Sequence, residues 1–446
     1  MIFETANRLS RFAVSVQGHF YLHGRTGGIM NQRSVFWEYL QQVPVVDTHE
    51  HFHRFTDSQG YDDLVSFLYF NSYACIPAVY FPQKTVDIIT DKTCDEKERF
   101  DAFCRFYEKI RYTQTGRTIR NIVRLWGIDD VTTENYVKLQ TGYANRLQTL
   151  KMPEQICAYI VNTAGHPLYG YVRGLKDYLA GKMPSEDKCY VNTAITGLHS
   201  FSKWEEITDV AYAADMEIGC VEELIAAVQR IMAACIRVGA VGFKDVYIYF
   251  RSWDIGLPDR IAAQKDFEKI RKGGISNGAL SDYMFYQAYD ICSQLRVPMG
   301  IHTGMTLTSA EPASNLGTLY PVIRAFPDLA FDLYHFNYPM LDLYVQMMRS
   351  CPNVYANGAF ATGFQPEYAK EFLREALRNI PTERVLAYGG DCHCAGEMTQ
   401  ITLIGALRTV HSVLTNAMEE GYLSLGEAEE VARIWLGESA KTLYGI

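Results

Sequence analysis

The sequence predicts an α/β fold, a (β/α)8 TIM barrel, from three observations. Hydrophobic residues make up 48% of the chain and charged residues 21%, as in an ordinary folded globular protein. Eight short β-rich segments alternate with amphipathic helical stretches, which indicates repeated βα units and a parallel sheet. The interval from His302 to His335 is close to the ~30 residues of one minimal βαβ unit. A doubly wound open sheet is the main alternative, and eight units favour the barrel.

Each predicted strand is short and apolar, and a helical pattern follows most of them. The strands are Pro44–Asp47, Ile156–Asn162, Cys189–Ala194, Ala240–Asp245, Val297–His302, Leu329–His335, Asn353–Asn357 and Val385–Asp391. Between them lie helices such as Val221–Val238, in which apolar residues recur three or four positions apart. Two more helices, near Thr399–Glu420 and Leu425–Tyr444, close the chain.

The domain organisation follows from the unequal spacing of these strands. The stretch from His51 to Ile156 far exceeds one βα connection and is helical and aromatic-rich. We therefore expect a helical insertion at approximately residues 59–150, placed after the first strand where it could roof the barrel mouth. Residues 1–42 are expected to form an N-terminal extension and helix, with residues 1–29 peripheral, and residues 43–446 the barrel.

Charge and cysteine content exclude several classes of protein. The chain has 51 acidic and 42 basic residues, a formal net charge of −9, without a long block of one sign. We therefore expect a small-molecule substrate, and neither nucleic acid nor membrane, as the partner. Eleven cysteines, mostly inside apolar runs, are typical of reduced thiols and predict a cytoplasmic protein. The sequence shows no apolar run of about 18 residues and no signal-peptide pattern.

Histidines at the carboxyl ends of predicted strands are the strongest functional signal. His49 and His51 are two residues apart and so face the same side, which lets both imidazoles bind one cation. His302 and His335 end the fifth and sixth predicted strands. Asp391 follows two glycines that allow the backbone to approach a neighbour closely. Three imidazoles and a carboxylate suit a divalent metal, with zinc first and iron, manganese or cobalt as alternatives.

Each of these residues also has an ordinary structural explanation. A single histidine at a strand end is more often a hydrogen-bonded structural residue, and one H-x-H pair is a weak signal. The ordered set across four strand ends is what favours metal binding. Cys392, His393 and Cys394 are interpreted as structural, because no second cysteine pair with zinc-site spacing occurs in the chain. His53 is expected to face the following loop.

At these motifs the chain resembles the amidohydrolase superfamily of metal-dependent (β/α)8 enzymes. The resemblance runs in strand order over about residues 43–446, apart from the insertion. The segments GFKDVYIYFRSWDIGL, VPMGIHTGM and GGDCH are most similar to the branch that includes nodulin-like domains fused to glutamine-synthetase-like proteins. The chain is more distantly similar to carboxymuconate-semialdehyde decarboxylases and uronate isomerases.

The resemblance implies a role for each matching position. His49 and His51 would be the ligands of the first strand and His302 the ligand of the fifth. Asp391 would be both a metal ligand and the proton shuttle, and His335 would bind a second metal or polarise the substrate. In the binuclear branches a lysine at the place of Lys244 is carbamylated. We expect one ion with Lys244 unmodified beside it, and two ions if Lys244 is carbamylated.

Lys244 and Arg251 are the candidate substrate-binding residues. A dication repels an ammonium, so an unmodified Lys244 must be neutral or stand back from the metal. It would then bind a substrate carboxylate or pair with Asp391 or Asp245. The guanidinium of Arg251 can hold a carboxylate through two hydrogen bonds, and a solvated loop arginine is an equally good explanation.

Aromatic residues are expected to have mainly structural roles. Tyr247 and Tyr249 are interpreted as strand residues, and Trp126 as packing within the insertion. Exposed aromatic stripes on the insertion would favour a homo-oligomer.

Three functions follow from this pattern. The leading hypothesis is a metal-dependent hydrolase that uses an activated water to cleave a C–N or C–O bond in a small, carboxylated substrate. The alternative is a metal-dependent decarboxylase or sugar-acid isomerase with the same ligands. A barrel that binds metal or ligand without catalysis is a third hypothesis, against which the complete ligand set argues.

Overall fold

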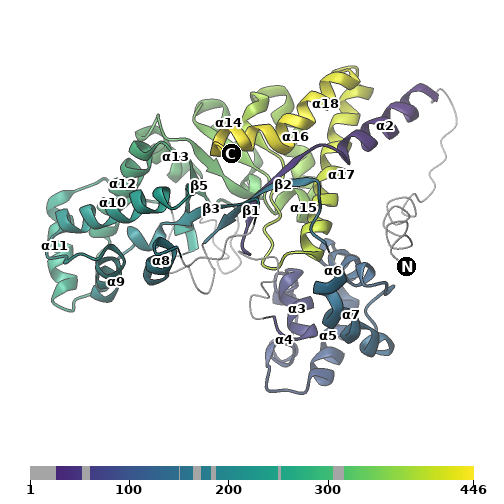
Figure 1. The fold of residues 1–446 in the computed structure, drawn as a ribbon, viewed down its shortest axis with the longest axis horizontal. Helices are drawn as coiled ribbons and strands as arrows, with labels where there is room; N and C mark the ends of the chain where they lie inside the picture. The colour runs from purple at the N-terminus through teal and green to yellow at the C-terminus, as the bar shows by residue number, and fades with distance from the viewer. Residues whose placement is uncertain are drawn as a thin grey trace.

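Eight parallel strands follow one another in chain order around a nearly closed barrel, with helices between them (Figure 1). This computed structural model describes residues 27–52, 61–149, 151–163, 172–181, 187–249, 253–304 and 316–446. The strands are β1 (Val45–Glu50), β2 (Ile156–Asn162), β3 (Cys189–Ala194), β4 (Ala240–Asp245), β5 (Met299–Ile301), β6 (Phe331–Leu333), β7 (Val354–Asn357) and β8 (Val385–Leu386). The predicted (β/α)8 barrel is therefore confirmed.

Hydrogen bonds between the first strand and the loop after β8 complete the ring. The Thr48 amide donates to the Tyr388 carbonyl oxygen at 3.3 Å, and the Asp391 amide donates to the His49 carbonyl oxygen at 2.7 Å. The same contacts bring Asp391 beside His49.

Amphipathic helices cover the outside of the barrel. In α10 (Val221–Arg237), Leu224, Val228 and Ile231 are buried while Glu222 and Arg230 are exposed, as the spacing predicts. The other barrel helices are α8 (Val172–Leu179), α9 (Trp204–Ala214), α11 (Arg260–Arg271), α12 (Ala279–Leu295), α13 (Leu316–Ala325), α14 (Leu341–Ser350), α15 (Ala361–Phe364), α16 (Pro366–Asn379) and α17 (Glu397–Glu419). Short helical turns are η3 (Thr196–Leu198), η4 (Tyr247–Tyr249), η5 (Tyr334–Asn337) and η6 (Thr382–Arg384).

The first and last described helices pack against other parts of the barrel. Helix α2 (Gly27–Leu40) packs against α17 and against α18 (Leu425–Arg433). After the π-helical turn η7 (Ile434–Glu438), the last helix α19 (Ser439–Tyr444) contacts β1 and β8. Apolar side chains of α19 join inward-facing residues of the strands in a small cluster that contains Val46, Ala158, Ile160, Leu386, Ala440 and Tyr444.

The segment between β1 and β2 is helical, and its helices lie together below the barrel in Figure 1, near α15 and α17. They are α3 (Leu64–Asn71), η1 (Pro77–Tyr80), α4 (Gln83–Thr90), α5 (Glu96–Ile110), α6 (Gln114–Leu125), η2 (Thr133–Asn135) and α7 (Tyr136–Thr149). Hereafter these helices are called the insertion. The boundary at residue 42, between the N-terminal extension and the barrel, remains a prediction.

Four predicted strands, those of β5, β6, β7 and β8, are longer than the observed ones, and one segment interpreted as strand is helical. The chain leaves the extended conformation soon after β6, where φ is 69° at His335, and again in the loop after β8, where φ is 55° at Asp391. Tyr247 and Tyr249 lie in η4 and not in a strand. The reason is local, since the Asp245 carboxylate accepts a hydrogen bond from the Tyr247 amide at 2.9 Å and turns the chain.

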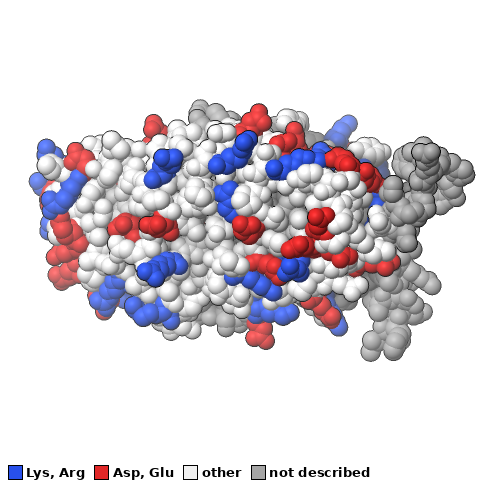
Figure 2. All heavy atoms as spheres, turned by 90° about the horizontal axis from the view of Figure 1, so that it is seen from above, with Lys and Arg blue, Asp and Glu red and all other residues white. Residues whose placement is uncertain are grey.

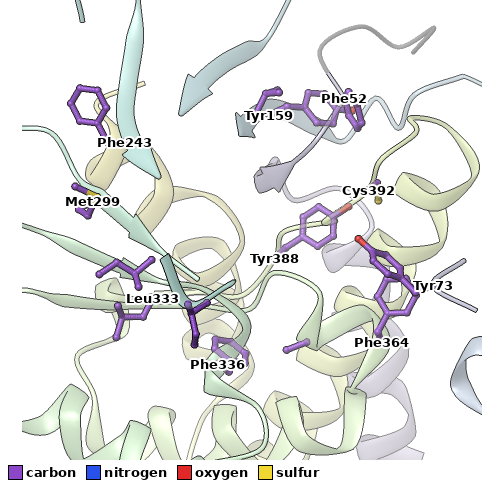
Figure 3. Packing of buried hydrophobic residues seen from close by; sticks show 14 of the residues in the cluster. Phe52, Tyr73, Tyr159, Phe243, Met299, Leu333, Phe336, Phe364, Tyr388 and Cys392 are labelled. Atoms are coloured by element: carbon purple, nitrogen blue, oxygen red, sulfur yellow. The ribbon is translucent and has the colours of Figure 1, made fainter. Parts of the chain in front are cut away.

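The core lies between the strands and the outer helices. Figure 3 shows Phe243, Met299 and Leu333, which come from the adjacent strands β4, β5 and β6 and are fully buried. All eleven cysteines are free thiols, and Cys392 and Cys394 are buried in this core. Acidic and basic side chains are interspersed on the face shown in Figure 2. Among the described helices, none has the length and hydropathy to cross a bilayer.

Candidate metal centre

Four histidines and one aspartate meet at the carboxyl edge of the barrel. The Nε2 atoms of His49 and His51 lie 3.3 and 3.1 Å from the same oxygen, Oδ1 of Asp391. On the other side of this carboxylate, Nδ1 of His335 is 3.9 Å from Oδ2. His302 stands behind His335, with its Nδ1 3.1 Å from Nε2 of His335. The end of β1 and the segments that follow β1, β5, β6 and β8 therefore bring together the four histidines and the aspartate that the sequence singled out.

Within this cluster, His49, His335 and Asp391 form the tightest group of potential ligands. One ligand atom from each lies within 4.8 Å of the other two. His51 adds a fourth nitrogen through its contact with Asp391. His302 was expected to be a ligand but is not in this tightest group. His335 was expected to stand beside the metal and is in the group.

Hydrogen bonds fix the tautomers of His335 and His302. A carbonyl oxygen can only accept, so Nδ1 of His335 carries the proton that it shares with the Ala359 oxygen at 3.0 Å. In a neutral imidazole Nε2 of His335 must then accept, and Nδ1 of His302 donates to it. This leaves a lone pair on Nε2 of His302, which is buried without a partner among the described residues. An orphaned buried acceptor of this kind fits a cation.

Burial keeps the imidazoles uncharged at neutral pH. It lowers the pKa of His49 and of His302 well below the ordinary value and the pKa of His335 to about 4. Burial alone would raise the pKa of Asp391, but His49, assisted by His51 and His335, holds it well below its usual range. Neutral imidazoles beside an ionised carboxylate are the protonation states in which these side chains bind metal.

Two acidic side chains of β1 hold the loop that carries Asp391. Oδ1 of Asp47 accepts a hydrogen bond from the Gly390 amide at 2.9 Å, and Oε2 of Glu50 accepts one from the Cys392 amide at 2.6 Å. Gly390 is required by close approach, because a Cβ there would lie 2.2 Å from Oε1 of Glu50. Glu50 thus points to the loop that carries Asp391, a role that was not predicted from the sequence.

Lys244 lies in the barrel interior beneath the imidazoles and is 1% exposed. Its Nζ is 3.4 Å from the centroid of the Tyr334 ring. Among the described residues Nζ has no hydrogen-bond partner, and it forms an ion pair with neither Asp391 nor Asp245. The Asp245 carboxylate instead binds His199 at 3.0 Å. Burial lowers the pKa of Lys244 well below its ordinary value, which favours the neutral amine.

The insertion contributes a tyrosine to the site that the sequence did not reveal. The hydroxyl of Tyr73, which follows α3, donates to the carbonyl oxygen of Asp391. Its ring packs on Phe364 with centroids 5.1 Å apart, and Figure 3 shows the two side by side below Cys392. A contact between residues 318 positions apart leaves no local pattern by which a single sequence could predict it.

His393 is a second neighbour that sequence reasoning underestimated. Its ring stacks on that of His51 with centroids 5.0 Å apart and an interplanar angle of 16°. The ring of Tyr73 is 5.9 Å away. The adjacent Cys392 is buried in the core. His393 thus borders the metal-ligand cluster, and its position in the GGDCHC motif was the available signal.

Two residues named from the sequence lie outside the described part of the chain. Arg251, the candidate carboxylate anchor, falls within 250–252, and His53 falls within 53–60. Their roles stay predictions.

Comparison with known proteins bears on this site. A family model described as amidohydrolase matches residues 260–446. Hereafter residues 260–446 are called the amidohydrolase segment, after the model that matches them. This amidohydrolase segment carries His302, His335 and Asp391, whereas His49, His51 and Lys244 precede it. The predicted resemblance is therefore confirmed. No curated protein matches the chain.

Solved structures extend the similarity of fold to nearly the whole chain. Uronate isomerases from Thermotoga maritima and Bacillus halodurans are 13% and 12% identical, with TM-scores of 0.68 and 0.69. Each match covers 95% of this chain, and 100% and 98% of the respective isomerase. A protein from Lactobacillus casei described as a metal-dependent hydrolase is 16% identical, with a TM-score of 0.58, and the match covers 92% of this chain and 97% of that protein. At these identities the similarity shows the fold.

Proposed function

We propose that the protein is a metal-dependent hydrolase that cleaves a C–N or C–O bond in a small, carboxylated substrate at the barrel mouth. The observation that carries the proposal is the convergence of four imidazoles and one carboxylate on the carboxyl edge of the barrel. In (β/α)8 enzymes this edge holds the active site.

We assign His49, His51, His302 and Asp391 as the residues that hold one divalent cation, with zinc as the first candidate. His302 is included because its buried Nε2 lone pair has no other partner among the described residues. When bound, such a cation acts as a Lewis acid and makes a water molecule nucleophilic near neutral pH. Lys244 supports a single ion, because its amine is packed on Tyr334.

The chain supplies the proton transfers around this water. Asp391 is ionised at neutral pH and lies within reach of both His49 and His51, so it can accept a proton and pass it to the leaving group. His335 is held from two sides, by the Ala359 oxygen and by His302, which orients its ring toward the carboxylate. Its one N–H, on Nδ1, would polarise the substrate by exchanging the Ala359 oxygen for an oxygen of the substrate.

A sugar-acid isomerase is the second candidate. It is favoured by the uronate isomerases from Thermotoga maritima and Bacillus halodurans, whose structures match this chain over nearly their full length with higher TM-scores than the hydrolase from Lactobacillus casei. The same Asp391 could move a proton between neighbouring carbons of a bound hydroxy acid.

Mass spectrometry of the reaction products separates these functions. We would incubate the zinc-loaded protein with carboxylated amides, lactams and lactones and, separately, with uronates. Hydrolysis adds the elements of one water to the products, isomerisation leaves the mass unchanged, and decarboxylation releases carbon dioxide. The proposal expects hydrolysis that falls by ~10²–10⁴ in Asp391→Asn. Isomerisation alone, or no turnover of any substrate, would overturn it.

A further inference from the structure

The floor of the metal centre is a buried polar layer to which the end of the chain contributes. In β6, Oδ2 of Asp332 accepts hydrogen bonds from the Tyr444 hydroxyl at 2.5 Å and from the Asn357 amide at 2.9 Å. The hydroxyls of Tyr444 and Tyr334 are 3.0 Å apart. All four residues are buried, and Tyr444 is 5% exposed.

Tyr444 reaches this layer from below. It is the last residue of α19, which contacts β1 and β8 and packs against inward-facing side chains such as Ile160 and Leu386. The apolar part of Tyr444 therefore lies with this lower cluster, while its hydroxyl lies among the polar groups above. A C-terminal helix thus closes the barrel interior and places one hydroxyl inside it.

Tyr334 connects this layer to the metal centre. Its hydroxyl also accepts a hydrogen bond from the Asn192 amide at 2.9 Å. The ring itself contacts the site, with its centroid 4.3 Å from that of the His49 ring and 3.4 Å from Nζ of Lys244. Gly300 provides the space, since a Cβ there would lie 2.7 Å from the Tyr334 hydroxyl.

We propose that Tyr444 is a positioning residue for the metal centre, because it fixes the Tyr334 ring against which His49 and Lys244 rest. The inference rests on the proposed metal site. Without the Tyr444 hydroxyl, Asp332 and Tyr334 each lose a buried hydrogen-bond partner, and the hydroxyl of Tyr334 keeps only its bonds to Asn192 and Asp332 among the described residues. A tilt of that ring would move the surface that supports His49.

The test compares cobalt(II) binding in wild type, Tyr444→Phe and Tyr355→Phe. Tyr355 packs against the same lower cluster, and its hydroxyl takes no part in the Asp332 network, so its variant is the matched control. Cobalt(II) reports its ligand geometry through visible absorption. We expect Tyr444→Phe to bind cobalt(II) about tenfold more weakly, with a shifted spectrum, because partners outside the ligand set tune metal affinity. Tyr355→Phe should match wild type.

A double-mutant cycle distinguishes positioning from a general loss of stability, and it keeps the test valid if Tyr444→Phe folds poorly. Tyr334→Phe removes the other hydroxyl of the same hydrogen bond and should weaken cobalt(II) binding similarly, while the double variant should add little. Wild-type affinity and spectrum in folded Tyr444→Phe, or fully additive effects, would overturn the inference. Should Tyr444→Phe not fold, an unchanged Tyr334→Phe would overturn it. Failure of wild type to bind cobalt(II) would overturn the proposed function as well.

Discussion

At the scale of single residues, the site depends on hydrogen bonds that leave particular atoms available. The sequence indicated which histidines meet, because four strand ends share one edge of the barrel. It could not indicate that Ala359 fixes the His335 tautomer and that His302 therefore keeps a free Nε2, since both follow from tertiary contacts. These contacts assign different roles to two residues of the same type.

Alanine variants of the two histidines test those roles. His302→Ala should lose most of the bound zinc, because it removes the orphaned lone pair. His335→Ala should keep zinc at near wild-type content while turnover falls at least tenfold. Metal analysis and product assays on the same preparations check both. If His335→Ala lost zinc and His302→Ala kept it, the assignment would be contradicted and the two roles would have to be exchanged.

Gly390 tests whether close backbone approach sets the position of Asp391. In Gly390→Ala the new methyl would meet Oε1 of Glu50, so the loop must shift and zinc affinity should fall tenfold or more. Gly426→Ala in α18 is the control, because a Cβ there meets nothing within 4 Å. It should be neutral or stabilise by up to ~1 kcal/mol. Zinc titration of both variants measures these affinities. An unchanged affinity in Gly390→Ala would show that close backbone approach does not set the position of Asp391.

The buried carboxyl of Asp332 makes folding depend on pH. Burial raises its pKa to about 6 from the usual 3.8, so its stabilising contribution is complete below pH 3.8 and is lost as pH rises through 6. The loss amounts to about 3 kcal/mol. The difference in free energy of unfolding between Asp332→Asn and wild type should therefore increase in favour of the variant by about 3 kcal/mol from pH 4 to pH 7. Urea unfolding of the metal-free proteins at both pH values measures it, and a pH-independent difference would contradict this assignment.

At the scale of secondary-structure elements, the insertion is tied to the barrel by a few polar contacts. Nε1 of Trp126, at the end of α6, donates to Oε1 of the buried Glu397 in α17 at 2.8 Å. The sequence predicted the insertion from the long gap between strands and Trp126 as a packing residue within it. It could not predict the partner 271 residues away. Strand ends were likewise overestimated wherever a site residue adopts positive φ.

Removing the Trp126 contact should loosen the insertion. Trp126→Phe leaves the buried Glu397 oxygen without this donor and should lower the free energy of unfolding by about 1–3 kcal/mol. Trp204→Phe is the control, because Trp204 packs on Phe267 between the outer helices α9 and α11 and is remote from the insertion in sequence. Denaturant titrations compare the two. Equal midpoints for wild type and Trp126→Phe would show that this hydrogen bond does not stabilise the fold.

At the scale of the whole molecule, the barrel brings together site residues from both ends of the described chain. The end of β1 and the residue after it supply His49 and His51, the amidohydrolase segment supplies His302, His335 and Asp391, and α19 closes the interior from below. The strand order and the edge at which these residues meet were predictable, because βα periodicity and strand-end placement are local patterns. The interior layer was not, because it joins residues of β3, β6, β7 and the last helix.

Metal analysis of protein purified without added metal tests the central claim most directly, with His49→Ala as the comparison. The account predicts about one equivalent of divalent metal in the wild type and close to none in His49→Ala, with no carbamate mass on Lys244. Wild-type protein without metal, or undiminished metal in His49→Ala, would contradict the proposed site. Two equivalents together with a carbamate would contradict the single-ion assignment.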